Sequence, residues 1–174
     1  MQTSRRSFLK IGVLGALTLA AGGAIYRVAN PPQPGRFILD GDARSVLAAV
    51  IPSMVGSSMM PAEAPARAAA INACVERVNG AILGLPLATQ KEVQDLFGLL
   101  ALGPARRFLA GVPDGWSSAT PQQIDAFLQS WRTHRIGMLQ TAYLAMHDLI
   151  AGSWYADPAN WAAIGYPGPI KELS

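Results

Sequence analysis

Proline and glycine residues divide the chain into segments whose apolar side chains recur at a spacing of three and four residues. That spacing puts side chains on one face of an α-helix, whereas a half-buried strand needs strict alternation. The first such segment carries Ala43, Val46, Leu47, Val50 and Ile51. No stretch alternates convincingly as a strand does. The pattern therefore predicts an all-α fold, built as a small helical bundle.

Cap residues and chain breakers set the expected limits of the first helices. Asp40 or Asp42 can cap the first helix, which Pro52 is expected to end. A second helix is expected over residues 65–83. Residues 89–92, Thr-Gln-Lys-Glu, have the pattern of a capping box and predict that a third helix begins there.

The second half of the chain has a stronger helix start. Residues 120–123, Thr-Pro-Gln-Gln, combine a cap, a first-turn proline and a glutamine at the third helical position. The apolar stripe over 124–150 fits one long helix, or two helices with a break near 133–137. Gly152 is expected to stop it, and a last short helix is expected over 159–163.

The beginning of the chain has the pattern of a twin-arginine export signal. That pattern is a Ser or Thr, two arginines, a polar residue and Phe-Leu-Lys, and it is met by Ser4, Arg5, Arg6, Ser7, Phe8, Leu9 and Lys10. An uncharged apolar run over 11–25 follows, which is shorter than the roughly 20 residues that span a bilayer comfortably. The pattern predicts export in the folded state through the twin-arginine translocase. The alternative is a short membrane-surface helix.

These features predict three parts of the chain. Residues 1–30 are expected to be the signal, either cleaved near Ala24 or Ala29 or retained as an N-terminal anchor. Residues 31–39 are expected to be a Pro-rich linker. Residues 40–174 are expected to form one helical domain that ends in a tail rich in Pro, Gly and aromatic residues.

The net charge of +3 belongs to the export signal. Residues 1–30 hold four of the 14 basic side chains and no acid, which leaves 10 basic and 11 acidic side chains in the rest. Nucleic-acid binding would need a basic domain. No nucleic-acid partner is therefore expected.

Cys74 is the only cysteine, so an intramolecular disulfide is excluded. A c-type haem needs Cys-x-x-Cys-His and an iron–sulfur cluster usually needs several thiolates, so this chain alone holds neither. Cys74 lies in an Ala-rich helical stretch, which favours a buried thiol acting as a small apolar side chain.

The sequence predicts no catalytic, cofactor-binding or metal site. Its two histidines, His134 and His147, are 13 residues apart and would lie off a common helix face. No nucleophile elbow and no glycine-rich phosphate loop is present in the domain. Two basic pairs, Arg106-Arg107 and Arg132-x-x-Arg135, fit solvated helix faces, or else contacts to an acidic patch on a partner.

The C-terminal tail concentrates aromatic residues among turn residues. Aromatic side chains bury much area at low entropic cost, and Pro and Gly stiffen the segment in advance of binding. The candidates for a partner interface are Trp154, Tyr155, Trp161, Tyr166, Pro167, Gly168 and Pro169. The alternative is a tail that folds back onto its own helices.

With these residues in view, the chain resembles the gluconate 2-dehydrogenase subunit 3 family. The resemblance covers the signal over 4–10, Ile51-Pro52 and Trp131-Arg132, and the middle of the chain matches only in being helical. Its most specific part is the end, Tyr155-x-Asp157-Pro158-x-x-Trp161-x-x-Ile164-Gly165-Tyr166-Pro167-Gly168-Pro169. The loop after Pro52 departs from the family pattern because it lacks an acidic residue expected nearby.

The resemblance implies a non-catalytic small subunit of a membrane-associated dehydrogenase in the periplasm. The large subunit would be an FAD-dependent sugar or alcohol dehydrogenase of the glucose-methanol-choline (GMC) type, and a multihaem c-type cytochrome often accepts its electrons. FAD would belong to that partner, and this chain would supply the export signal and help the partner fold. Two alternatives remain: a free-standing periplasmic ligand-binding protein or enzyme, and a scaffold tethered by an uncleaved signal.

Overall fold

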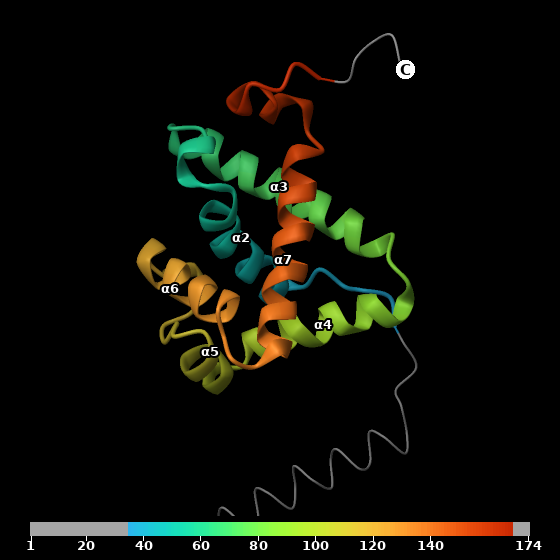
Figure 1. Cartoon of the computed structure of the whole chain (residues 1–174), viewed down its shortest axis with the longest axis vertical. Helices are drawn as coiled ribbons and strands as arrows, with labels where there is room; N and C mark the ends of the chain where they lie inside the picture. Colours follow the sequence, from blue (N-terminus) through green and yellow to red (C-terminus); the bar gives the residue numbers. More distant parts are fainter. Residues whose placement is uncertain (1–34, 169–174) are drawn as a thin grey trace, which may run out of the picture. The chain divides into compact units, whose positions relative to one another are not determined.

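Helices make up most of the described part of the chain, residues 35–168, in the computed structural model (Figure 1). In order they are α2 (Gly41–Val55), η1 (Ser57–Met59), α3 (Ala64–Leu83), α4 (Leu87–Ala101), α5 (Gly103–Leu109), η2 (Trp116–Ser118), α6 (Pro121–Arg132), α7 (Gly137–Tyr155), η3 (Pro158–Asn160) and η4 (Ala162–Ile164), where η marks a 3₁₀ turn. No strand occurs among these residues. The all-α prediction is confirmed. The predicted export signal lies outside the described residues.

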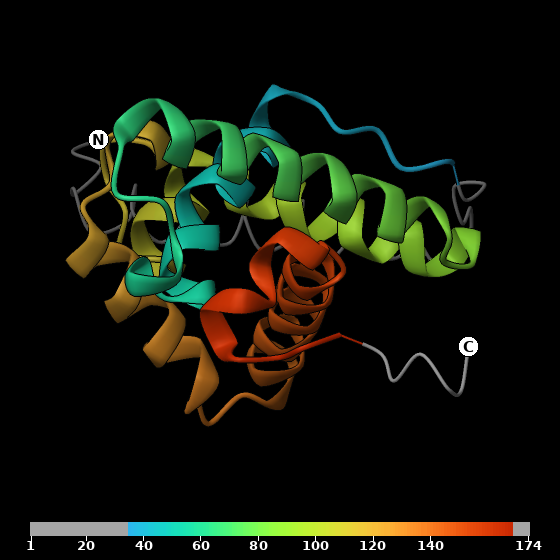
Figure 2. The ribbon, with the colours of Figure 1, turned by 90° about the horizontal axis from the view of Figure 1, so that it is seen from above.

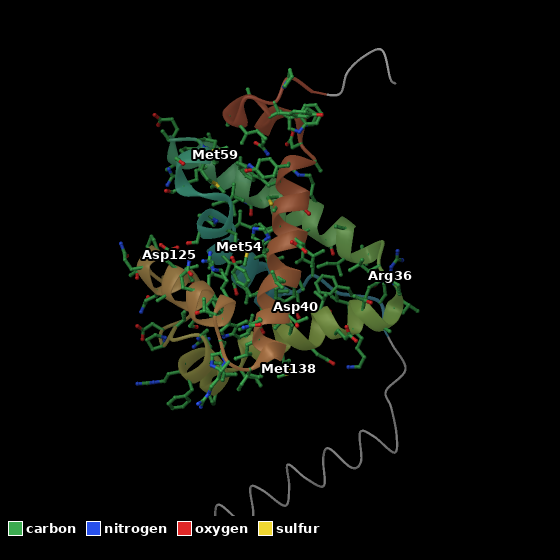
Figure 3. The ribbon with its side chains drawn as sticks, in the orientation of Figure 1. Arg36, Asp40, Met54, Met59, Asp125 and Met138 are labelled. Atoms are coloured by element: carbon green, nitrogen blue, oxygen red, sulfur yellow. The ribbon has the colours of Figure 1, made fainter. Side chains whose placement is uncertain are left out.

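Helix α2 is the central element, because it packs against α3, α4, α6 and α7. The apolar stripe predicted for it is fully buried: Ala43, Val46, Leu47, Val50 and Ile51. The carboxylate of Asp40 caps its start by accepting a hydrogen bond from the Ala43 amide at 2.8 Å. Asp40 is labelled in Figure 3. Of the two caps expected, Asp40 is therefore the one used.

Two expected helix ends are wrong. Helix α2 continues past Pro52 to Val55, and the Gly56 amide donates to the Pro52 carbonyl at 3.0 Å. Helix α7 likewise continues past Gly152, whose carbonyl accepts from the Ala156 amide at 2.9 Å. A proline lacks the backbone N–H that would donate within the helix, and a glycine raises the entropic cost of forming the helix. Neither prevents the following backbone amides from bonding when the helix is held by packing against its neighbours.

The two expected capping boxes have different outcomes. Thr120 and Gln123 form the predicted box, in which each backbone amide donates to the other side chain. Thr89 caps nothing, because α4 already begins at Leu87. Gln90 instead bonds the Phe37 amide at 2.9 Å and the Leu85 carbonyl at 2.8 Å, and so fixes the segment that leads into α2. This buried role of a glutamine is invisible to a local pattern.

Three aromatic rings in edge-to-face contact connect the second half of the bundle. The Phe127 ring lies edge-on to Trp116 and to Trp131, with ring centres 5.5 and 4.9 Å apart. The indole N–H of Trp116 donates to the Leu100 carbonyl, and that of Trp131 donates to the Leu109 carbonyl. The first bond joins η2 to the end of α4, and the second joins α6 to the end of α5. The stripe over 124–150 is divided into α6 and α7 at the predicted break.

The bundle has two distinct ends along its longer direction. Helix α7 packs across α3 and α2 and runs from one end to the other (Figures 1 and 2). The turns η3 and η4 lie where α7 finishes, whereas α5 and the α6–α7 connection lie where α7 begins (Figure 1). Within residues 35–168, none of the helices has the length and apolar character needed to cross a bilayer.

Candidate partner-binding surfaces

Residues 156–168, which we call the C-terminal cap, fold back on the end of α7. The Asp157 carboxylate accepts from the Ala159 amide at 3.0 Å and so starts η3. Its other oxygen lies 3.0 Å from the guanidinium of Arg77 on α3, which also donates to the Ser153 carbonyl at 2.9 Å. Arg77 therefore joins α3, α7 and the cap. The pair is partly exposed, so we assign it a positioning role more than a large stabilising one.

Trp161 is the centre of the cap. Its indole N–H donates to the Tyr155 carbonyl at 2.7 Å, and its ring lies edge-on to Tyr166 with centres 5.2 Å apart. Gly168 closes the turn with a φ of +95°, and a Cβ there would lie 3.2 Å from the Trp161 ring. A glycine is therefore required by both its backbone and its neighbour.

The tail residues predicted as a partner interface fall into different environments. Trp154 is only 1% exposed, so its assignment to the surface is wrong. The reason is that α7 does not stop at Gly152, which places Trp154 on the core face, one and two turns after Ile150 and Met146. Tyr155 is half-buried against the core. Pro169 lies outside the described residues.

The outer face of the cap is formed by the remaining residues of the motif. Ile164 and Tyr166 are 48% and 45% exposed, Pro167 is exposed, and Trp161 and Gly168 are half-buried beneath them. The two alternatives for the tail thus combine, because the cap folds onto its own helices and still presents apolar side chains outward. Exposed apolar groups on a rigid frame are typical of a binding surface.

A second apolar surface, which the sequence reasoning missed, lies at the opposite end of the bundle. We call it the α5-end surface, and its exposed apolar residues are Leu99, Leu102, Phe108, Leu109, Ile136 and Met138. Phe108 is 81% and Met138 73% exposed. Met138 is labelled where α7 begins, at the end that also holds α5 (Figure 3). No residue of α5 is buried, because the helix has only seven residues and covers the end of α4.

The two basic pairs seen in the sequence lie at this same end. Arg106 is structural, since its guanidinium donates to the carbonyls of Val112 and Pro113. Arg107, Arg132 and Arg135 are exposed. The Trp131–Leu109 hydrogen bond holds the ends of α5 and α6 together and so brings the pairs near each other. The signal that could have revealed this surface is a Phe-Leu pair beside arginines in a helix too short to bury them.

The histidines take local roles. The Nδ1 of His134 accepts from the Ile136 amide at 3.0 Å, and His147 stacks on Tyr143 and contacts Asp148. Among the described residues, no three side chains of the metal-binding types are grouped together.

Two clefts away from the α5 end are candidate ligand sites. One of about 560 Å³ lies between α3 and α7, beside Arg77 and Ser153, and one of about 340 Å³ lies between α2 and the start of α6, beside Ser45 and Trp116. Neither is lined by His134, Arg135, Tyr143 or His147. The surfaces therefore remain the better candidates for function.

Comparisons with known proteins gave no match, since neither a protein-family model, nor a curated protein, nor a solved structure is significantly similar to this chain.

Proposed function

We propose that this chain is the non-catalytic small subunit of an FAD-dependent GMC-type sugar or alcohol dehydrogenase. It escorts the folded large subunit through the twin-arginine translocation pathway and stabilises it in a complex at the periplasmic side of the inner membrane. FAD belongs to the large subunit, and a multihaem c-type cytochrome would take the electrons onward. The proposal rests on the resemblance carried by residues 4–10 and 155–169.

The observation that carries the proposal is the C-terminal cap. The most specific residues of the resemblance have two roles in the cap. Asp157, Trp161 and Gly168 build it. Ile164 and Tyr166 face outward from it. A surface already ordered before binding loses little entropy when it docks. An escort needs such a surface and an export signal, and needs no active site of its own.

The test is affinity purification of the tagged full chain from its native membrane and periplasm, followed by visible absorption spectroscopy. We expect a flavin spectrum and a co-purifying protein several times larger. The matched variants are Ile164→Ser with Tyr166→Ser in the cap, and Leu87→Ser with Ile38→Ser on exposed sites elsewhere. The cap pair should lose most of the flavin, and the control pair should keep it. A colourless single chain would instead favour the free-standing periplasmic ligand-binding protein or enzyme.

Export is tested separately. Replacement of Arg5 and Arg6 by lysine should hold this chain and its large subunit in the cytoplasm, which cell fractionation and immunoblotting of both proteins would show. Normal export of that variant would refute the export role. N-terminal sequencing of the mature protein distinguishes a cleaved signal from an anchor, because a start near Pro31 eliminates the tethered scaffold.

A further inference from the structure

The α5-end surface has a charge that differs from the rest of the described chain. Residues 96–113 and 126–147, which include this surface, contain four arginines and no acidic residue, and Asp95, Asp114, Asp125 and Asp148 border these two segments. The remainder of residues 35–168 contains five basic and ten acidic side chains. A molecule with charge separated in this way turns its basic end toward an anionic surface before any contact forms.

Cationic and apolar side chains are neighbours in the sequence of this surface. Arg107 directly precedes Phe108 on α5, and Arg135 precedes Ile136 and Met138 at the start of α7. A long arginine side chain can keep its charge at the level of phosphate groups while neighbouring apolar groups enter the acyl region. Phe108 and Met138 are mostly surrounded by solvent, so both side chains protrude. Phe108 also borders an open hollow of about 430 Å³ beside Arg107 and Pro113.

We infer that the α5-end surface binds the surface of a phospholipid bilayer that carries anionic headgroups. The protruding side chains enter the interface, and Arg107, Arg132 and Arg135 contact the headgroup phosphates. An acidic protein face would also attract the arginines, but it would need a matching pocket for each protruding apolar group. A fluid bilayer accommodates them without one. This inference is independent of the proposed function, which uses the cap at the other end of the bundle.

The test uses the full chain with an environment-sensitive fluorophore on a single introduced cysteine. Met138→Cys reports on the α5-end surface, and Ile164→Cys on the cap is the matched control at the opposite end (Figure 1). Native Cys74 is buried and should not take the label. The local probe is needed because the apolar segment before residue 31 could attach the whole chain to vesicles.

With vesicles of phosphatidylcholine and phosphatidylglycerol, the emission of the label at 138 should shift to the blue, and the label at 164 should not respond. Phosphatidylcholine alone should give a much weaker response. Adding Arg107→Gln, Arg132→Gln and Arg135→Gln to the Met138→Cys chain should lower the apparent partition coefficient roughly a hundredfold, because each cation near an anionic membrane contributes about a fivefold factor. Added salt should weaken the response of the unmutated surface.

Two outcomes would overturn the inference. One is an absent shift at 138, or an equal shift at 138 and 164. The other is a shift at 138 produced by the purified flavoprotein without lipid, which would make this end a protein interface. A further experiment separates this inference from the proposed function. If the α5-end surface binds lipid and not the flavoprotein, the triple arginine variant should co-purify with as much flavin as the unmutated chain does.

Discussion

At the scale of single residues, Gly168 shows how the cap depends on one missing side chain. Its positive φ is a conformation that L-residues rarely adopt, and an added Cβ would lie only 3.2 Å from the Trp161 ring. Gly168→Ala should therefore open the cap, at a cost of roughly 1–3 kcal/mol. We expect faster hydrogen exchange of the Trp161 indole N–H, which bonds to Tyr155 in the native cap. Gly165→Ala is the control, since its φ is also positive but nothing lies within 4 Å of its added Cβ. Equal exchange in both variants would mean that the contact is unimportant.

Cys74 gives a second prediction at this scale. Burial raises the pKa of the Cys74 thiol from 9.0 to about 11, and nearby Arg77 opposes the change only in part. The neutral thiol is inert, so a maleimide should react with Cys74 only in denaturant at neutral pH.

The unfolded thiol ionises near pH 9 while the folded one does not. The contribution of this group to stability is thus complete below pH 9 and is lost as the pH rises toward 11. The free energy of unfolding of a Cys74→Ala chain should therefore fall less between pH 8 and pH 10.5 than that of the unmutated chain. Urea unfolding at the two pH values measures this. Rapid labelling of the native protein would contradict the burial.

At the scale of elements, the two threonines that begin apparent capping boxes make a matched pair. Thr120 accepts the Gln123 amide at the start of α6, whereas Thr89 lies inside α4. Thr120→Ala should lower the free energy of unfolding by about 1 kcal/mol, because the Gln123 amide loses the hydroxyl that accepts its hydrogen bond. Thr89→Ala should change it by less than about 0.5 kcal/mol, since it caps nothing and alanine favours a helix. Urea unfolding of both variants measures the difference, and equal losses would refute the assigned helix starts.

The same elements show which features the sequence could predict. The buried stripe of α2, the break between α6 and α7, and the Thr120 cap follow from local spacing and hydrogen bonding, so they were predictable. The continuation of α2 past Pro52 and of α7 past Gly152 depends on packing against other helices, which local patterns do not report. The end predicted at Gly152 placed Trp154 outside the helix and among the candidates for a surface, whereas the continued helix places it in the core. The α5-end surface was missed because its arginines and apolar groups come from segments that only the Trp131–Leu109 bond and the fold bring together.

At the scale of the whole described unit, the cap and the α5-end surface lie at opposite ends of the bundle, and α7 runs between them (Figure 1). Substitutions at sites this far apart with no shared partner usually act independently. Occupation of one end should therefore leave the affinity of the other unchanged.

If both proposals hold, this chain connects a flavoprotein to the bilayer, and the purified large subunit should float with phosphatidylglycerol-containing vesicles only when the chain is present. Flotation on a density gradient, read by flavin absorbance, measures this. The cap variant with Ile164→Ser and Tyr166→Ser should leave the flavin at the bottom while the chain itself still floats. The triple arginine variant should leave the flavin bound to the chain but reduce the share that the α5-end surface brings to the vesicles. Competition between vesicles and the large subunit for this chain would mean that both partners use the same face, and the assignment of one end to each would then be wrong.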